Sequence, residues 1–117
     1  MDFSTLLGKV LVSIHGGVDN SELIFTTSTG TQYKLYHQQD CCETVYIEDI
    51  VGELDDLIGS PILMAEEVTQ AADAKHWADT ATWTFYKLAT LKGYVTIRWY
   101  GTSNGYYSET ADFCKVA

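Results

Sequence analysis

Alternating apolar and polar residues predict that most of the chain forms β-strands. Residues 9–14 alternate and stop at a run of turn-forming residues, 16–20. Residues 22–27 have the composition of a returning strand, and a further turn at 28–30 leads to a third strand at 32–36. Because the connections are short, this pattern predicts a meander of three antiparallel strands.

The middle of the chain is less regular. Residues 44–50 are apolar and β-branched, as a fourth strand requires. Residues 52–58 lie between glycines and hold their acids early, where the positive end of a helix dipole stabilises them, so they predict a short helix. An extended segment at 62–68 follows, and the small polar residues 69–79 predict a loop.

The last third shows the clearest alternation. Strands are predicted at 81–89, 94–100 and 106–116, with turns at 91–93 and 101–105. At 117 residues, with no linker or internal repeat, the chain is expected to form one domain, residues 1–117. The expected fold class is α+β, predominantly antiparallel β, with about seven or eight strands and one short helix near residues 52–58.

Charge changes the picture of the middle region. The chain has 16 acidic and 7 basic residues, a net charge of −9, and 46% hydrophobic residues, which favours a folded acidic protein. The 40 residues 35–74 contain no lysine or arginine. Such an acidic chain is not expected to bind nucleic acid directly, whereas a cation or a basic protein surface suits it. Ten carboxylates lie in this window: Asp40, Glu43, Glu48, Asp49, Glu53, Asp55, Asp56, Glu66, Glu67 and Asp73.

The sequence also bounds the cellular setting. No apolar run approaches the roughly 20 residues of a membrane span, so we expect no membrane association. The N-terminus lacks the basic region of a signal peptide. Three cysteines do not make a disulfide framework, so we expect free thiols and a cytoplasmic location.

A histidine and two cysteines form the first candidate site. His37, on the same predicted strand face as Tyr33 and Leu35, precedes Cys41 and Cys42. These three side chains are candidates for a zinc site, but successive residues of an extended chain point to opposite faces, and packing of one cysteine inward is the simpler interpretation. A Cys41–Cys42 disulfide is less favoured still, because of its strained eight-membered ring. A nucleophilic thiol is disfavoured because neighbouring carboxylates raise its pKa.

The second candidate site surrounds Arg98, the only arginine. On its strand it shares a face with Tyr94 and Tyr100. Stacking on tyrosines and a grip on phosphate by the guanidinium suit a flat, phosphorylated ligand. The alternative is that Arg98 pairs with a carboxylate while the tyrosines are half-buried on a sheet face. The residues expected to bind the ligand are Arg98, Tyr94, Tyr100, Asn104, Tyr106, Tyr107, His37 and Gln38.

Several segments resemble a family of small proteins of unknown function from bacteriophages and prophages, marked by a His-x-Gln-Asp-Cys-Cys-Glu motif. The resemblance covers nearly the whole chain. It implies an accessory phage protein in the bacterial host cytoplasm, of a kind that commonly interferes with host defence, and assigns a role to no residue. The segments are 37–43 (HQQDCCE), 45–50 (VYIEDI), 52–61 (GELDDLIGSP), 83–87 (WTFYK), 93–101 (GYVTIRWYG) and 103–109 (SNGYYSE).

Two functions of different classes follow. The favoured hypothesis is a non-enzymatic counter-defence protein, acting as a homo-oligomer, that sequesters a small nucleotide-type signal without any cofactor. The alternative is an acidic inhibitor that presents a nucleic-acid-like surface to the basic surface of a host defence nuclease. A metal-stabilised structural protein is the third. The acids expected to face a basic partner are Asp40, Glu43, Glu48, Asp49, Glu53, Asp55 and Asp56.

Overall fold

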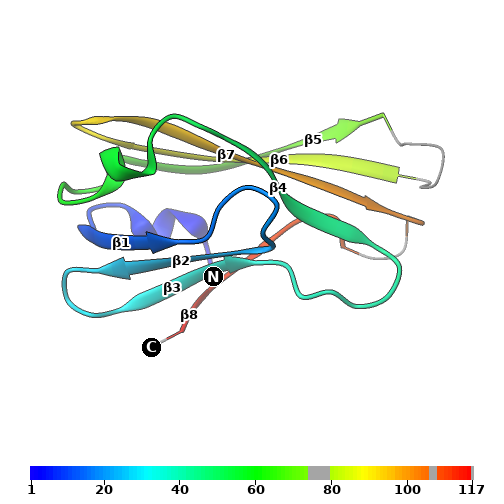
Figure 1. Ribbon diagram of the computed structural model, residues 1–117, viewed down its shortest axis with the longest axis horizontal. Helices are drawn as coiled ribbons and strands as arrows, with labels where there is room; N and C mark the ends of the chain where they lie inside the picture. The colour runs from blue at the N-terminus through cyan, green and yellow to red at the C-terminus, as the bar shows by residue number, and fades with distance from the viewer. Residues whose placement is uncertain (74–79, 106–107, 117) are drawn as a thin grey trace.

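A computed structural model of the chain describes residues 1–73, 80–105 and 108–116. Within this part the chain forms eight antiparallel strands in two four-stranded sheets, stacked one above the other in Figure 1. The strands are β1 (Leu11–His15), β2 (Glu22–Thr27), β3 (Gln32–Tyr36), β4 (Thr44–Val51), β5 (Met64–Ala72), β6 (Thr80–Thr90), β7 (Gly93–Ser103) and β8 (Asp112–Lys115). Two single-turn 3₁₀ segments are η1 (Phe3–Leu6) and η2 (Leu54–Leu57).

The chain passes from one sheet to the other at one end of the sandwich. The first sheet has the strand order β1-β2-β3-β8, which confirms the predicted meander of the first three strands. The second sheet has the order β4-β7-β6-β5. The connections from β3 to β4 and from β7 to β8 both lie at the right-hand end in Figure 1. These crossings bring residues near 40 and near 110 together.

The core lies between the sheets because alternate residues of most strands point inward. Leu35 of the first sheet and Trp99 of the second are both fully buried. Phe3 of η1 adds to this core, with its ring packed edge-on against Tyr86 at 4.9 Å and Phe113 at 5.3 Å between centroids. Edge-on contacts of this kind are favourable beyond the buried area alone.

The predicted helix near residues 52–58 is wrong, and the fold is mainly β, not α+β. Only Leu54–Leu57 turn helically, as a single 3₁₀ turn. Gly52 has a φ of 100°, which is not helical, and the chain is extended again from Ile58. Too few residues remain between these points to complete the hydrogen bonds of an α-helix.

The predicted loop at residues 69–79 is wrong over its first part. β5 extends to Ala72, and its last residues pair with β6 through Thr69↔Thr84 and Ala72↔Ala81. Because β5 is an edge strand with most side chains exposed, backbone pairing holds small polar residues there. Residues 74–79 lie outside the described residues. The last strand is shorter than the predicted 106–116, since β8 begins only at Asp112.

Candidate aromatic site on the outer sheet face

The outer face of the second sheet has a row of three aromatic side chains. Tyr46 of β4 lies opposite Tyr100 of β7, which lies opposite Trp83 of β6. The ring centroids of Trp83 and Tyr100 are 4.5 Å apart, and those of Tyr46 and Tyr100 are 6.3 Å apart. Tyr100 is buried, while Tyr46 and Trp83 are half-buried. Cross-strand register therefore builds a continuous aromatic surface.

This row forms part of a pocket of about 380 Å³, which we call the aromatic pocket. Exposed Asp73 and half-buried Glu48 add two carboxylates to its lining. Burial first, then the neighbouring Tyr46, Glu109 and Asp73, raise the pKa of Tyr100, so its hydroxyl stays neutral. The full lining is Tyr46, Glu48, Ala72, Asp73, Trp83 and Tyr100.

Arg98 lies on the same face, next to the pocket, and its charge is already paired. Its Nε is 2.5 Å from Oε2 of Glu48, and its Nη2 is 3.7 Å from Oδ2 of Asp49. The hydrogen bond to Glu48 is the main cause of a raised Arg98 pKa. A register irregularity between Ile47 and Asp49 allows two consecutive acids to reach one arginine, because a bulge redirects side chains.

The guanidinium also lies over an aromatic ring. The Cζ atom of Arg98 is 5.0 Å from the centroid of the Trp83 ring, within the range of a cation–π contact. Arg98 is thus paired with carboxylates, as the alternative interpretation of the sequence expected. Its contact with Trp83 was not predicted.

The remaining residues predicted to bind the ligand do not gather here. Tyr94 lies on the same strand face, but six residues from Tyr100, or about 20 Å along a strand. His37 is buried on the inner side, and Gln38 is exposed in the β3–β4 connection. Asn104 is exposed just after β7. Tyr106 and Tyr107 lie outside the described residues.

His37 belongs to a second cluster, at the buried end where the chain crosses between sheets. Its Nδ1 donates to the carbonyl oxygen of Thr110 at 3.2 Å, because a carbonyl can only accept. Its Nε2 lies 3.8 Å from Oε2 of Glu43 and makes no hydrogen bond within the described structure. Both side chains are almost completely buried.

Glu43 organises the connection around itself. Its Oε1 accepts hydrogen bonds from the backbone N–H groups of Asp40 at 3.1 Å and Cys41 at 3.0 Å, and from Nε2 of Gln39 at 2.7 Å. Burial alone would raise the pKa of Glu43, but the backbone donors and His37 outweigh it and lower the pKa below its ordinary value. The carboxylate is therefore ionised and acts as the centre of a folded loop.

The cysteines in this loop contradict the expectation of free thiols. Cys41 and Cys42 are joined in a disulfide, and only Cys114 remains free. The expectation rested on the count of three cysteines and on the strained ring that adjacent cysteines would form. In the structure, hydrogen bonds from the backbone N–H groups of Asp40 and Cys41 to Glu43 bend the chain at this point. Within the described residues no three His, Cys, Asp or Glu side chains are placed to hold a metal ion.

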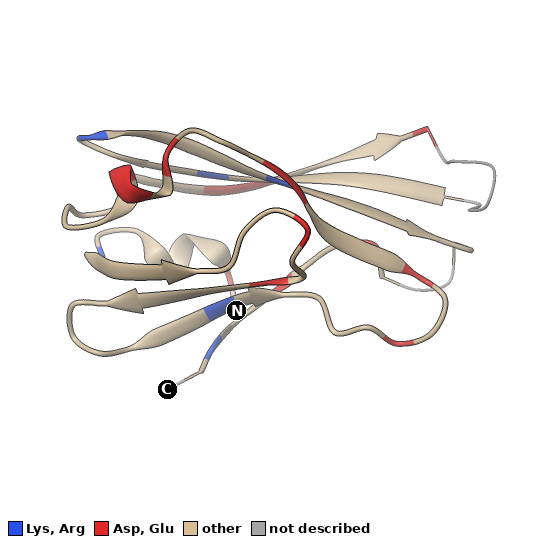
Figure 2. Cartoon of the chain, viewed as in Figure 1, with Lys and Arg blue, Asp and Glu red and all other residues tan. Residues whose placement is uncertain are grey.

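The acidic residues of the middle region do not form one face. Figure 2 shows acidic residues spread over both layers and several loops. Glu43 is buried, Glu48 and Asp49 meet Arg98, and Glu67 accepts a hydrogen bond from the Tyr86 hydroxyl at 3.0 Å. The other exposed acids of this region are Asp40, Glu53, Asp55, Glu66 and Asp73, while Asp56 is half-buried.

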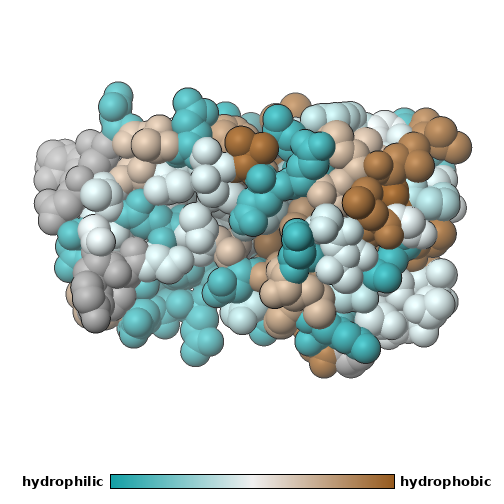
Figure 3. Space-filling model, turned by 180° about the vertical axis from the view of Figure 1, so that it is seen from behind, coloured by the Kyte–Doolittle hydropathy of each residue, from teal (hydrophilic) through white to brown (hydrophobic). Residues whose placement is uncertain are grey.

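On the rear face, exposed apolar residues gather at the end opposite the crossing connections (Figure 3). Figure 3 shows hydrophobic residues gathered toward the right-hand side of the rear view, which is the left-hand end of Figure 1. Leu91, in the β6–β7 turn, is 85% exposed, and Leu7 and Leu63 are also exposed.

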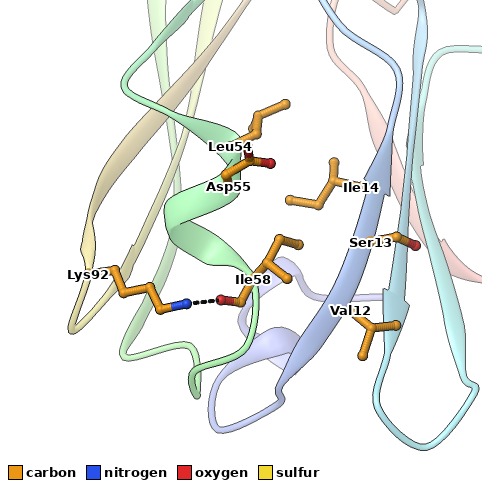
Figure 4. A pocket seen from close by; sticks show the side chains of 7 residues that line it. All are labelled: Val12, Ser13, Ile14, Leu54, Asp55, Ile58 and Lys92. Atoms are coloured by element: carbon orange, nitrogen blue, oxygen red, sulfur yellow. Dashed lines mark hydrogen bonds between the residues drawn. The ribbon is translucent and has the colours of Figure 1, made fainter.

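A separate groove opens on the front, between the edge strand β1 and η2. Its volume is about 390 Å³. Figure 4 shows Ile14, Leu54 and Ile58 directed into the space between the two segments. The lining residues are Val12, Ser13, Ile14, Leu54, Asp55, Ile58 and Lys92, and we call this space the β1 groove.

Residues 4–113 match the model of a domain of unknown function, DUF7448. The chain belongs to this family. No curated protein and no solved structure matches this chain. In the described part of the chain no helix is long and apolar enough to cross a membrane.

Four lining residues of the aromatic pocket were missed by sequence reasoning: Tyr46, Ala72, Asp73 and Trp83. Strand alternation already places Tyr46 and Trp83 on the side opposite the core. What the sequence lacked was the register that sets Tyr46, Tyr100 and Trp83 side by side, because these pairings join strands far apart in the chain.

Proposed function

We propose that this chain is a non-catalytic binding protein that holds a basic side chain of a partner protein in the aromatic pocket. The observation behind the proposal is that Arg98 already faces two carboxylates. With Arg98 paired, the pocket offers aromatic rings together with the carboxylates of Glu48 and Asp73. Aromatic faces and negative charge together suit a cation.

A phosphate group fits this arrangement poorly. To reach the Arg98 guanidinium it would have to displace Glu48 from a 2.5 Å contact. It would then sit close to Glu48 and Asp73, and like charges that lose solvent repel each other strongly. A lysine or arginine side chain need not displace Glu48 from Arg98 and is attracted by the two carboxylates. Its apolar stem can lie along Trp83 or Tyr46.

The wider setting follows from the phage-family resemblance. A net charge of −9 favours association with a basic protein surface. We therefore propose a phage accessory protein that acts against host defence by binding a basic region of a defence protein in the host cytoplasm. Because the acids are dispersed, this binding relies on one local site and not on a surface that imitates nucleic acid along its length.

Sequestration of a nucleotide remains the second candidate. The observation in its favour is the aromatic row itself, with the Arg98 guanidinium 5.0 Å from the Trp83 ring. A base could stack beside Trp83, and Arg98 could turn toward a phosphate. The two proposals make opposite predictions for Arg98, since a phosphate needs its charge whereas a cation is repelled by it.

Titration of the protein with Nα-acetyl-arginine amide and with AMP, followed by NMR of the tryptophan indole N–H groups, tests the proposal. We expect the arginine amide to shift the Trp83 indole signal. Trp83→Ala, followed through the backbone amide signals of Tyr46 and Tyr100, should weaken this binding about tenfold. Arg98→Met should strengthen it, because it leaves Glu48 and Asp49 without their cation. Tyr94→Ala, on the same face but outside the pocket, is the matched control and should change nothing.

The opposite pattern would overturn the proposal. If AMP binds, the arginine amide does not, and Arg98→Met abolishes AMP binding, the pocket is a nucleotide site. Asp73→Asn provides a second variant at an exposed position, where folding is not at risk. It should weaken binding of the arginine amide and leave binding of AMP unchanged.

A further inference from the structure

The outer edge of β1 is covered along only part of its length. The segment leading into β1 and its first residue pair with the chain between η2 and β5. Gly59 N donates to Leu11 O at 2.9 Å, and Ile62 N donates to Lys9 O at 2.9 Å. Isolated bridges join Val10 to Pro61 and Leu11 to Ile58. The protein thus already uses the first part of this edge to add an extended segment.

Beyond Leu11 the edge is open. Ser13 to His15 pair with β2 on one side, and Val12 lies at a register irregularity between Leu11 and Ser13. On the other side, Val12 to His15 make no backbone hydrogen bond to any described segment. The exposed N–H and C=O groups of an edge strand are a template for another extended chain. The β1 groove, of about 390 Å³, lies directly along this open part.

The side chains of the β1 groove define which chain would fit. Ile14, Leu54 and Ile58 form an apolar wall, as Figure 4 shows. The Lys92 ammonium donates to the Ile58 carbonyl oxygen at 2.8 Å, so its position is fixed within the protein. The exposed Asp55 carboxylate, by contrast, has no hydrogen bond or ion pair within the part of the chain that the structure describes. The groove therefore offers one apolar wall, the Lys92 ammonium bound to a backbone carbonyl, and the Asp55 carboxylate, which is free to pair with a cation.

We propose that the β1 groove binds an extended, basic segment of a partner protein, which adds to β1 as a further strand. Four residues, Val12 to His15, span about 13 Å of strand. An alternating segment would place apolar side chains against Ile14 and Leu54 and a lysine or arginine near Asp55. A second copy of this chain is a poorer occupant, because each copy has a net charge of −9.

This inference concerns a different surface from the aromatic pocket. The groove involves β1, η2 and the β6–β7 turn, whereas the pocket lies on the outer face of β4, β7 and β6. Failure of cation binding at Trp83 would leave the β1 groove untouched, and the reverse also holds.

The test mixes the peptide acetyl-Lys-Val-Lys-Val-Lys-Val-amide with this protein and follows binding by the NMR shifts of the backbone amides. We expect saturable shifts at Val12 to His15. The same peptide with alternate backbone nitrogens methylated keeps its charge and side chains but loses strand donors, so it should bind at least about tenfold more weakly. Asp55→Asn should weaken binding of the unmodified peptide about threefold, and Glu66→Gln, on the edge strand β5 of the second sheet, should not.

Two results would overturn the proposal. Equal binding of both peptides, with shifts spread over the acidic surface, would mean that charge alone attracts them. Shifts at Val12 to His15 that depend on protein concentration and not on peptide would mean that a second copy covers the edge. Shifts confined to Val12 to His15, lost on methylation and reduced only by Asp55→Asn, would support it.

Discussion

Two acid–base pairs in this protein are built from similar groups and differ in every contact that surrounds them. Glu43 and His37 are buried where the chain crosses between the sheets, and Glu43 accepts hydrogen bonds from two backbone N–H groups. Glu48 and Arg98 lie on the outer sheet face, each with about a third of its side chain exposed. The first pair shapes a loop, while the second stands beside a pocket that a partner can reach.

The buried end contains a second acid of the structural kind. Glu109 accepts hydrogen bonds from Thr82 at 2.8 Å, from Ser103 at 2.5 Å and from Thr80. Burial alone would raise the pKa of Glu109. The hydrogen bonds from the three hydroxyl groups have the larger combined effect, so the pKa lies below its ordinary value. The crossing end is thus held by two ionised carboxylates, each surrounded by donors, so changes there should affect folding far more than changes on the outer face.

The largest effect is expected for Gly101→Ala. Gly101 of β7 lies against the backbone of Glu109, and an added Cβ atom would collide with the Glu109 carbonyl group. The backbone atoms of Glu109 cannot move aside without disturbing the β7–β8 connection, so we expect the free energy of unfolding to fall by about 3 kcal/mol. Urea denaturation of the variant and the wild type measures this difference.

Gly17→Ala is the matched control. An added Cβ atom at Gly17 meets no atom within 4 Å, and its φ is not in the left-handed region, so stability should be unchanged. If Gly101→Ala were as stable as Gly17→Ala, the close packing of β7 against the β7–β8 connection would not exist in solution.

The next effect is a dependence on pH. The pKa of Glu43 is lowered from 4.5 in the folded protein, so its ionised form stabilises folding at neutral pH. This contribution is fully present above 4.5 and is lost as the pH falls through the lower folded-state pKa. Glu43→Gln should therefore lower the urea midpoint at neutral pH and flatten its decline toward about pH 3.5.

An exposed acid supplies the comparison. Glu22 is 53% exposed and meets Lys34 at 3.7 Å, a contact that solvent screens. Glu22→Gln should leave the urea midpoint and its pH dependence close to those of the wild type. Equal slopes for the wild type and Glu43→Gln would show that the buried carboxylate does not stabilise the folded chain in its ionised form.

Much of the fold could be predicted because strands follow local alternation. Val95, Ile97 and Trp99 are buried, and Tyr94, Thr96 and Arg98 face outward, as the period of two requires. The η2 segment could not be predicted in the same way, since its acidic early residues fit a helix, whereas the chain is extended at Glu53 and again at Ile58 and leaves only four residues for one 3₁₀ turn. The last residues of β5 are strand only because β6 pairs with them.

The candidate sites were harder to predict than the strands. Arg98 and Tyr100 are two residues apart, so alternation alone put them together. Trp83 joins them through strand pairing, and Asp73 through the end of β5, neither of which a sequence pattern reveals. His37 was grouped with Arg98 by residue type, but it follows β3 in the other sheet and is buried. Residue type alone therefore suggested which side chains could bind a ligand together, but the strand pairing determines which of them lie close to one another.

The smallest expected effect separates the two acid–base pairs most directly. Because Arg98 and Glu48 are partly exposed, a double-mutant cycle with Arg98→Met and Glu48→Gln should give a coupling energy of about 0.5–1 kcal/mol in the free energy of unfolding. High salt should reduce it, since exposed charges are screened. A salt-independent coupling above about 3 kcal/mol would instead be typical of a buried pair. Arg98 would then be part of the framework, like Glu43, and Glu48 would not be available to a partner's cation.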